Sequence, residues 1–168
     1  MSPTISRKAE QDRSDDFSVD NQIGFLLRVA HQRHSANLSA CLSQFELTVP
    51  QAIVLVRLLE SKNPSQNLLG RLVAMEPANI RDVVVRLKKR GLVRQAKDPK
   101  DGRLLLLSLT PEGRALAAKL VPLAVESVAM TLSNLNSKER DHLRDLLKKI
   151  VAVSTSEQRS NGKAHAQP

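Results

Sequence analysis

Apolar residues recur at helical spacing along most of this chain, and the pattern predicts a mainly α-helical fold. The first helix is expected over residues 21–45 and the second over 49–60, where Thr48 can serve as the N-cap. A short third helix follows over 66–73, with Ser65 as its N-cap. The side chains expected to face the core are Ile53, Val56 and Leu58 or Leu59 from the second helix, and Leu68, Leu69 and Leu72 from the third.

The next segment pairs a helix with a β-hairpin. The predicted helix covers 77–90, with Pro77 in its first turn and Gly91 just past its end. Two helices separated by a tight turn are the elements of a helix-turn-helix. The runs 92–97 and 103–109 are typical of short strands, and the residues between them are rich in turn formers. A hairpin that follows a helix-turn-helix is a wing.

Two further helices are expected after the wing. Thr110-Pro111-Glu112 combines an N-cap, a first-turn proline and an acidic residue, and so opens a helix that runs to about residue 134. Ser137 is the expected cap of the last helix. The side chains of this helix that we expect to face inward are Leu143, Leu146, Leu147 and Ile150.

The order of these elements predicts one folded domain over residues 19–153, with a polar tail at each end. Residues 1–18 and 154–168 hold few apolar side chains, so we expect both tails to be disordered. The fold class is mainly α with a small β wing. Its expected parts are a winged helix-turn-helix at about 47–110 and terminal helices at about 20–45 and 111–153.

Positive charge is concentrated in the same central region. The chain carries a formal net charge of +9, and residues 57–103, with 12 basic and 5 acidic side chains, contribute +7 of it. Aromatic residues are limited to three Phe, with no Trp and no Tyr. Binding of single strands by base stacking needs exposed aromatic side chains, whereas duplex DNA is bound through its phosphates and groove edges. The composition therefore favours double-stranded DNA as the partner.

Other classes of protein find little support in the sequence. No apolar run reaches the roughly 18 residues that cross a bilayer, and the N-terminus does not resemble a secretory signal, so we expect no membrane association. A single cysteine, Cys41, excludes a disulfide within the chain and fits the cytoplasm. No nucleophile elbow, phosphate-binding glycine loop or apolar carboxylate pair is present. We therefore expect neither an enzyme nor a cofactor.

Five short signatures follow one another along the chain. They are Leu47-Thr48-x-x-Gln51, Ser65-Gln66-x-x-Leu69, Arg86 to Val93, Asp98 to Arg103, and Leu109-Thr110-x-x-Gly113. In this order and at this spacing they make the chain resemble the MarR family of transcriptional regulators, closely over roughly residues 47–120. The resemblance implies a regulator that binds double-stranded DNA as a homodimer through the terminal helices, and many such regulators respond to small aromatic acids.

The helix over 77–90 is the expected recognition helix. At 100° per residue its apolar side chains cluster on one face and leave the opposite side for the major groove. Asn79 can pair with adenine, and Arg81 can pair with guanine. Contacts of Arg81 and Arg86 with phosphates alone stay open as an alternative. The predicted DNA contacts from this helix are Ala78, Asn79, Arg81, Asp82, Val85, Arg86 and Lys89, and Ser65 and Gln66 join them from the helix before.

Asp82 departs from the family pattern, which more often has a basic or neutral residue there. A carboxylate that faces DNA either accepts a hydrogen bond from cytosine or neutralises a nearby cation. We expect Asp82 to pair with Arg86, one turn along the helix.

In the wing, the resemblance implies that Arg103 enters a minor groove while Asp101 orients its guanidinium through an ion pair. Gly102 stands where the family usually has another arginine, so we do not expect the phosphate or groove contact that this arginine would make. Lys97 and Lys100 are expected to supply positive charge in its place.

The first helix carries candidates for an effector site. Arg28, His31 and His34 follow one another at intervals of three residues, and a guanidinium with imidazoles can bind a small carboxylate. The alternative is that they form dimer salt bridges or face solvent. The resemblance points to an aromatic acid, such as a hydroxylated or nicotinate-like catabolite. A homodimer would read a pseudo-palindromic operator, with recognition helices about 34 Å apart.

Three rival functions stay open. His31 with His34 or His142 lacks a carboxylate or thiol at ligand spacing, which disfavours a metal site. Cys41 lies on the apolar side of its helix and is interpreted as a structural thiol rather than a redox sensor. An architectural DNA-binding protein without an effector would show the same basic region but little preference for sequence.

Overall fold

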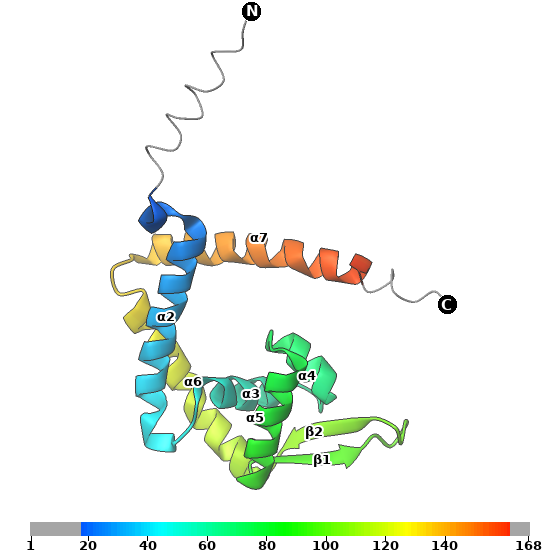
Figure 1. Cartoon of the computed structure of the whole chain (residues 1–168). Helices are drawn as coiled ribbons and strands as arrows, with labels where there is room; N and C mark the ends of the chain where they lie inside the picture. The colour runs from blue at the N-terminus through cyan, green and yellow to red at the C-terminus, as the bar shows by residue number, and fades with distance from the viewer. Residues whose placement is uncertain (1–17, 162–168) are drawn as a thin grey trace, which may run out of the picture. The chain divides into compact units, whose positions relative to one another are not determined.

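The computed structural model describes residues 18–161, and the chain divides into two compact units that meet between Thr131 and Leu132. The first unit is helical with one two-stranded sheet, and the second contributes a single helix to the described residues (Figure 1). The predicted fold class, mainly α with a small β wing, is confirmed. The elements are η1 (Val19–Asn21), α2 (Ile23–Leu42), η2 (Ser43–Phe45), α3 (Val49–Glu60), α4 (Gln66–Leu72), α5 (Pro77–Lys89), β1 (Val93–Lys97), β2 (Leu105–Leu109), α6 (Pro111–Thr131) and α7 (Ser137–Asn161).

The core of the first unit lies where α3 packs against α5 on one side and against α2 and α6 on the other. In Figure 1, α2 and α6 cross and pack against each other, and the hairpin extends away from the helices. Because α3 has partners on two sides, it buries a broad face rather than a narrow stripe. The largest side chains enclosed by this arrangement are Leu42, Leu55, Leu69, Ile80, Leu87, Leu107 and Leu120.

The predicted inward faces of α3 and α4 are partly wrong. Of the predicted set in α3, Leu58 is buried, Val56 and Leu59 are half-buried, and Ile53 is 39% exposed. The other buried side chains of α3 are Gln51, Ala52, Val54 and Leu55. In α4 the buried pair is Leu69 and Gly70, whereas Leu68 and Leu72 are exposed. Gly70 lies against α5, where a Cβ would be only 3.2 Å from Cγ2 of Ile80. Because glycine has no side chain, α4 can approach α5 with Gly70 facing Ile80. In this orientation Leu68 and Leu72 face solvent.

The predicted helix boundaries around the helix-turn-helix are confirmed. The side chain of Gln51 accepts a hydrogen bond from the Thr48 backbone N–H at 2.9 Å, which completes a capping box at the start of α3. Ser65 Oγ accepts a bond from Leu68 N–H at 3.3 Å at the start of α4. Gly91 has φ +69° just past the end of α5. Local capping signals therefore located these helices correctly.

The wing is the antiparallel pair β1 and β2, in which Val93 is opposite Leu109 and Lys97 is opposite Leu105. Strand β1 begins one residue later than predicted, at Val93, and β2 begins at Leu105 rather than 103. The start of β2 is displaced because residues 98–104 form a closed tip in which the Asp98 N–H donates to the Leu104 carbonyl oxygen at 2.8 Å. On its other edge, β2 is bonded to the chain before α4: the Leu107 N–H donates to the Pro64 carbonyl oxygen at 2.9 Å. The wing and the start of α4 are therefore directly joined.

The junction between the wing and α6 is built around Thr110. Its hydroxyl donates to the Gly91 carbonyl oxygen at 2.7 Å and accepts from the Gly113 N–H at 3.0 Å. Its backbone N–H donates to the Leu92 carbonyl oxygen at 3.1 Å. A Cβ at Gly113 would overlap that same Leu92 carbonyl. The signature Thr110-x-x-Gly113 therefore holds the first turn of α6 against the base of the wing.

The cap of α7 differs from the prediction. Asn136, rather than Ser137, is the N-cap: its Oδ1 accepts from the Glu139 N–H at 3.1 Å, and Glu139 Oε2 accepts from the Asn136 N–H at 2.7 Å. This reciprocal pair is a capping box, which a lone serine cannot form.

The lengths of the last two helices also differ from the prediction. Helix α6 ends at Thr131, before the expected residue 134. Helix α7 continues to Asn161, past the predicted boundary at 153, since no glycine or proline interrupts it before Gly162. The remaining parts of the predicted tails, 1–17 and 162–168, lie outside the described residues.

The apolar stripe of α7 is not buried as predicted. Leu146, Leu147 and Ile150 are exposed, and Leu143 is only half-buried. Among the residues that the structure describes, the second unit contributes only this one helix, so the stripe has no partner within that unit. By length and composition, no single helix between residues 18 and 161 could cross a membrane, and one strongly bent pair, 23–45 with 49–60, passes that test together.

Candidate nucleic-acid interface

The recognition helix α5 turns one face to the core and the other to solvent, as predicted. Ile80, Val84 and Leu87 are buried, and Val83 is half-buried. All seven predicted reading residues, Ala78, Asn79, Arg81, Asp82, Val85, Arg86 and Lys89, are exposed. In the part of the chain that the structure describes, no hydrogen bond or ion pair engages the side chains of Asn79, Arg81, Asp82 or Arg86. They are free to meet DNA.

A shallow groove of about 440 Å³ runs between α5 and the start of α3. Asn79, Asp82 and Arg86 line it from α5, so these three occupy one flank of the recognition helix. At 100° per residue, Arg81 projects from the opposite flank, with Lys89 on the crest between the two. The remaining lining residues are Thr48, Pro50, Gln51, Met75 and Val83.

The predicted ion pair between Asp82 and Arg86 is absent from the described residues, where the ion pairs are Arg57–Glu60, Arg144–Asp141 and Lys148–Asp145. Both side chains are exposed to water, in which an isolated pair contributes little free energy. Asp82 and Arg86 therefore enter the groove as separate charges.

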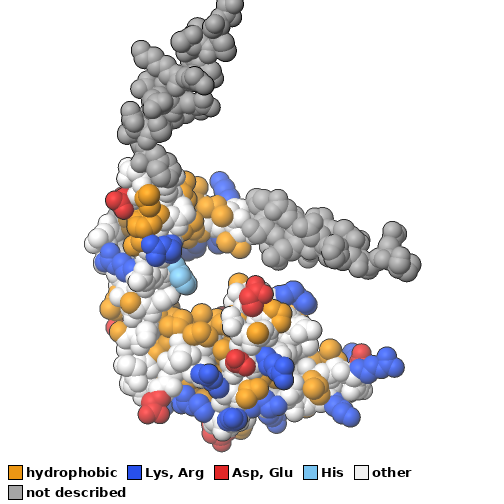
Figure 2. Space-filling model, viewed as in Figure 1, with side chains coloured by type: hydrophobic (Ala, Val, Ile, Leu, Met, Phe, Trp, Pro, Cys, Tyr) orange, Lys and Arg blue, Asp and Glu red, His pale blue; other side chains and the backbone are white. Residues whose placement is uncertain are grey.

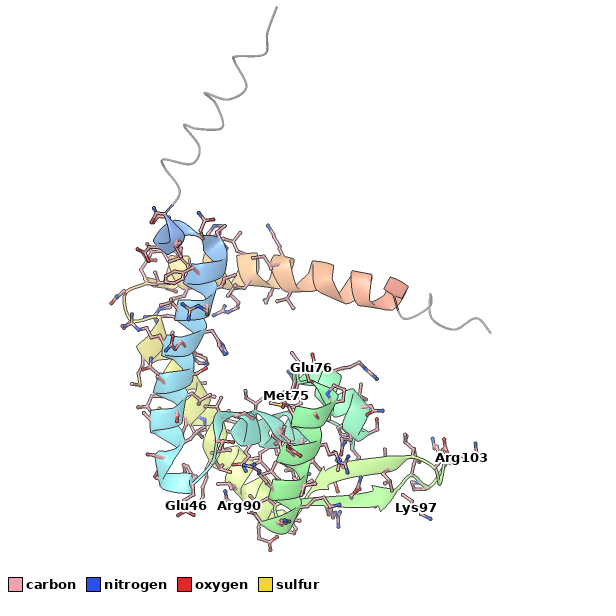
Figure 3. All side chains as sticks on the ribbon, in the orientation of Figure 1. Glu46, Met75, Glu76, Arg90, Lys97 and Arg103 are labelled. Carbon is pink, nitrogen blue, oxygen red and sulfur yellow. The ribbon has the colours of Figure 1, made fainter. Side chains whose placement is uncertain are left out.

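Basic side chains gather over α5 and the hairpin (Figure 2). Lys97, Lys100 and Arg103 of the wing are all exposed, and Lys97 and Arg103 point outward from the hairpin in Figure 3. This distribution matches the excess of +7 over residues 57–103 and gives the first unit a strongly cationic end. Such a surface attracts the phosphates of duplex DNA.

Asp101 acts on Arg103 differently from the prediction. Asp101 Oδ1 accepts a hydrogen bond from the backbone N–H of Arg103 at 3.0 Å, and both side chains are exposed, with no pairing of carboxylate and guanidinium. Asp98 forms the same kind of turn with the Lys100 N–H at 2.8 Å. Because Asp101 holds the main chain, it sets the direction in which Arg103 leaves the wing and leaves the guanidinium free.

We expect Arg103→Ala to weaken DNA binding strongly and Asp101→Ala to reproduce much of that loss, although it removes a negative charge. Asp101→Asn is the matched control, since its amide oxygen keeps the turn while the charge is lost. It should bind DNA at least as well as the unchanged protein. Fluorescence anisotropy with a labelled duplex measures all three. Tighter binding by Asp101→Ala would contradict a positioning role for Asp101.

Ser65 and Gln66 are half-buried at the start of α4. The Ser65 hydroxyl oxygen caps α4 by accepting from the Leu68 N–H. The backbone of Ser65 also forms an isolated antiparallel β-bridge with Leu106 of the wing. The Ser65 hydroxyl proton is not used by this cap, so a phosphate contact by Ser65 stays a prediction.

Two basic residues missed by the sequence analysis support α5. Lys88 Nζ donates to Gln95 Oε1 of β1 at 2.7 Å. The Arg90 guanidinium donates to the carbonyl oxygens of Glu46 and Phe45. Both lie in the signature Arg86 to Val93, but no local pattern distinguishes a cation that binds its own chain from one that binds DNA.

The three effector candidates lie along α2 in separate local environments. Arg28 is exposed, with Cζ 5.0 Å from the centre of the Phe25 ring. His31 is exposed, with Nε2 3.5 Å from Ser35 Oγ. His34 is half-buried, with Nδ1 3.2 Å from Thr131 Oγ1 of α6. Successive steps of three residues spread them over an arc of about 120° and about 9 Å of helix.

A small pocket of about 190 Å³ lies where α2, α3 and α6 meet, and none of the three candidates lines it. Most of its walls are apolar, and the Arg57–Glu60 ion pair, 3.1 Å long, lies at its edge. The sequence analysis missed this pocket, because its residues come from three helices: Leu38, Leu42, Ala52, Ile53, Val56, Arg57, Glu60, Leu120 and Ala124.

Within residues 18–152 no group of three or more His, Cys, Asp or Glu side chains could hold a metal ion. Cys41 is a free thiol of intermediate burial on α2.

Comparison with known proteins decides the family. A model described as "MarR family" matches residues 45–104. The HTH-type transcriptional repressor NicR of Pseudomonas putida is 36% identical over 135 residues, which cover 80% of this chain and 85% of NicR. This chain belongs to the MarR family. The DNA-binding and regulatory function predicted from the five signatures is therefore confirmed. The relatives of this chain are transcriptional regulators rather than enzymes.

Solved structures of transcriptional regulators match about four-fifths of the chain. A probable transcriptional regulator from Pseudomonas aeruginosa is 44% identical with a TM-score of 0.73, over 79% of this chain and 99% of that protein. BpsR of Bordetella bronchiseptica is 36% identical with a TM-score of 0.76, over 80% of this chain and 96% of BpsR. DNA binding by BpsR is regulated by 6-hydroxynicotinic acid.

Proposed function

We propose that this MarR-family protein is a homodimeric repressor that leaves a pseudo-palindromic operator when a small aromatic acid binds. The observation that carries the proposal is the free reading face of α5 in a chain that is 36% identical both to the repressor NicR and to BpsR, a protein regulated by 6-hydroxynicotinic acid. The acid expected here is hydroxylated or nicotinate-like.

Exposed apolar side chains on the terminal helices support a homodimer. Ile23 of α2 is 71% exposed and Val125 of α6 is 66% exposed, and Ile150 and Val151 of α7 are exposed as well. Apolar stripes of this extent usually mark an interface in a protein of this size. A two-fold dimer would present two recognition helices about one duplex turn apart, which matches a pseudo-palindromic operator.

The hydrogen bonds around Thr131 support His34 as an effector ligand. Thr131 donates its only hydroxyl proton to the Ser127 carbonyl oxygen at 2.7 Å and accepts from Asn37 Nδ2 at 3.1 Å. We therefore assign the proton of the neutral His34 ring to Nδ1, which donates to the second lone pair of Thr131. Nε2 then offers a lone pair to the ring hydroxyl of an aromatic acid. Arg28, with its guanidinium exposed, would pair with the carboxylate.

We expect 6-hydroxynicotinic acid to weaken binding to operator DNA by about 5-fold to 150-fold, and DNA to weaken binding of the acid by the same factor. The operator is a duplex selected from a random pool by the unchanged protein. Arg28→Ala should abolish the response and keep the affinity for DNA without acid within about threefold, because Arg28 is far in sequence from the groove-reading elements. Anisotropy titrations with and without acid measure both effects.

Arg33→Ala is the matched control, since Arg33 lies on the same helix with an exposed side chain, and it should respond to acid normally. Arg57→Ala tests the pocket between α2, α3 and α6. If only Arg57→Ala lost the response to acid, the effector site would be this pocket rather than the surface around Arg28. A wild-type protein released by neither this acid nor a panel of hydroxylated aromatic acids would contradict the effector class.

A further inference from the structure

Arg90 is the first residue after α5, and its guanidinium lies against the corner that joins α2 to α3. Nη1 donates to the Glu46 carbonyl oxygen at 2.7 Å, and Nη2 donates to the Phe45 carbonyl oxygen at 3.1 Å. Glu46 and Arg90 lie beside each other in Figure 3. One side chain therefore spans 45 residues of sequence to connect the recognition helix with the end of the first long helix.

The acceptor side of this contact is a helix end. Helix α2 continues directly into η2, which ends at Phe45, and Glu46 then takes a left-handed φ of +51°. The last carbonyl groups of a helix have no partner within it and carry the negative end of the helix dipole. A guanidinium that donates to two consecutive carbonyls gives them hydrogen-bond partners and places a positive charge at the negative end of the dipole. Leu47, buried directly after this turn, anchors the corner in the core.

The backbone that carries Arg90 is also held by hydrogen bonds at the end of α5. The Arg90 N–H donates to the Arg86 carbonyl oxygen at 3.1 Å, so its backbone still follows the last turn of α5. The Leu92 N–H donates to the Leu87 carbonyl oxygen at 3.0 Å, and Gly91 has φ +69°. These are the features of a closed helix end. The side chain of Arg90 therefore joins two rigid ends, that of α2–η2 and that of α5.

We propose that Arg90 is a positioning residue, which fixes the angle of the recognition helix relative to α2 and carries a movement of α2 to the DNA-reading face. Both of its end nitrogens are used within the chain, which distinguishes it from Lys89, an exposed cation without such a bond. Helix α2 packs mainly on α6 and α3, whereas α5 packs on α3 and α4, so Arg90 provides a direct polar link between them.

The test compares Arg90→Met, which keeps the length of the side chain without its donors, with Arg90→Lys and Lys89→Ala. Each is titrated into a selected operator duplex and into a random duplex over a salt series. For Arg90→Met we expect about a tenfold loss on the operator and a much smaller loss on random DNA. Arg90→Lys should restore little of the operator affinity, since one ammonium group cannot reproduce two hydrogen bonds from separate guanidinium nitrogens to two carbonyl oxygens. Lys89→Ala should weaken both duplexes and lower the salt slope by about one.

Other outcomes would overturn the proposal. Equal losses on both duplexes with full rescue by lysine would make Arg90 a phosphate contact. A lower unfolding temperature with an unchanged ratio of operator to random affinity, measured well below that temperature, would make it merely structural.

A second measurement uses the effector and rests on the proposed function. With 6-hydroxynicotinic acid, Arg90→Met should bind the acid as the unchanged protein does, while the ratio of operator affinities with and without acid falls toward one. A normal ratio would contradict transmission through Arg90. If the unchanged protein ignores the acid, the proposed effector fails, and the comparison of duplexes still tests the positioning role.

Discussion

Gly113→Ala is expected to lower the free energy of unfolding by about 3 kcal/mol or more, because the new methyl group would overlap the Leu92 carbonyl oxygen. The clash is with backbone, which cannot rotate away as a side chain can. Thr110 prevents the first turn of α6 from retreating, since it is bonded to Gly91, Leu92 and Gly113 at once. Relief would require opening the junction between the wing and α6.

Gly24→Ala is the control for this prediction. Gly24 also lies in the first turn of a helix, but a Cβ there has nothing within 4 Å. Alanine should therefore leave stability unchanged or raise it by up to about 1 kcal/mol. Urea denaturation followed by circular dichroism measures both variants. Similar midpoints for the two would mean that α6 can shift without cost, contrary to the close contact at Leu92.

Arg81→Ala is expected to cost about 1 to 3 kcal/mol on the operator and to relax preference at one base position. Arg81 projects from the flank of α5 opposite the groove and makes no hydrogen bond within the described residues, so its guanidinium can approach guanine undistorted. Lys89→Ala should weaken binding to all sequences alike, because Lys89 is the last residue of α5 and base edges are contacted mainly by the N-terminal part of a recognition helix, which leaves Lys89 for the phosphates. Selection of binding sites from a random pool by each variant measures the difference.

Both variants should retain the stability of the unchanged protein, since both side chains are exposed. That makes a loss of DNA binding attributable to the interface. If Arg81→Ala lost affinity equally on operator and random duplex, the contact of Arg81 would be with phosphates, the alternative that the sequence leaves open.

Features encoded by neighbouring residues could be predicted from the sequence. The caps at Thr48 and Ser65, the end of α5 at Gly91 and the buried face of α5 each depend on residues within a few positions of one another. Hydrogen bonds of this kind form within a single turn, so the local order of residue types determines them. The predicted DNA-reading face was correct in its exposure for the same reason.

Features that depend on packing partners could not be predicted in this way. Leu68 and Leu72 looked like core residues by spacing, but the close approach of Gly70 to Ile80 decides which side of α4 faces inward. Arg90 binds a carbonyl 44 residues away. Periodicity describes one helix at a time and carries no information on which neighbour it meets.

The wing illustrates a further limit. The sequence indicates an interaction between Asp101 and Arg103, and the two residues do interact, but through the backbone N–H of Arg103 rather than between the charged groups. Two side chains two positions apart can form either arrangement, and the closed tip between Asp98 and Leu104 selects the backbone bond. Residue identity therefore indicated the pair without indicating its geometry.

The free reading face of α5 has a consequence for how such regulators diverge. Its residues face solvent and support no other part of the described chain, so substitutions there change stability by little. Thr110 and Gly113, in contrast, tolerate almost no change, because the fold depends on them. A lineage with this scaffold can therefore acquire a new operator through a few single substitutions on one helix, while the junction at Thr110 and Gly113 keeps the wing in place.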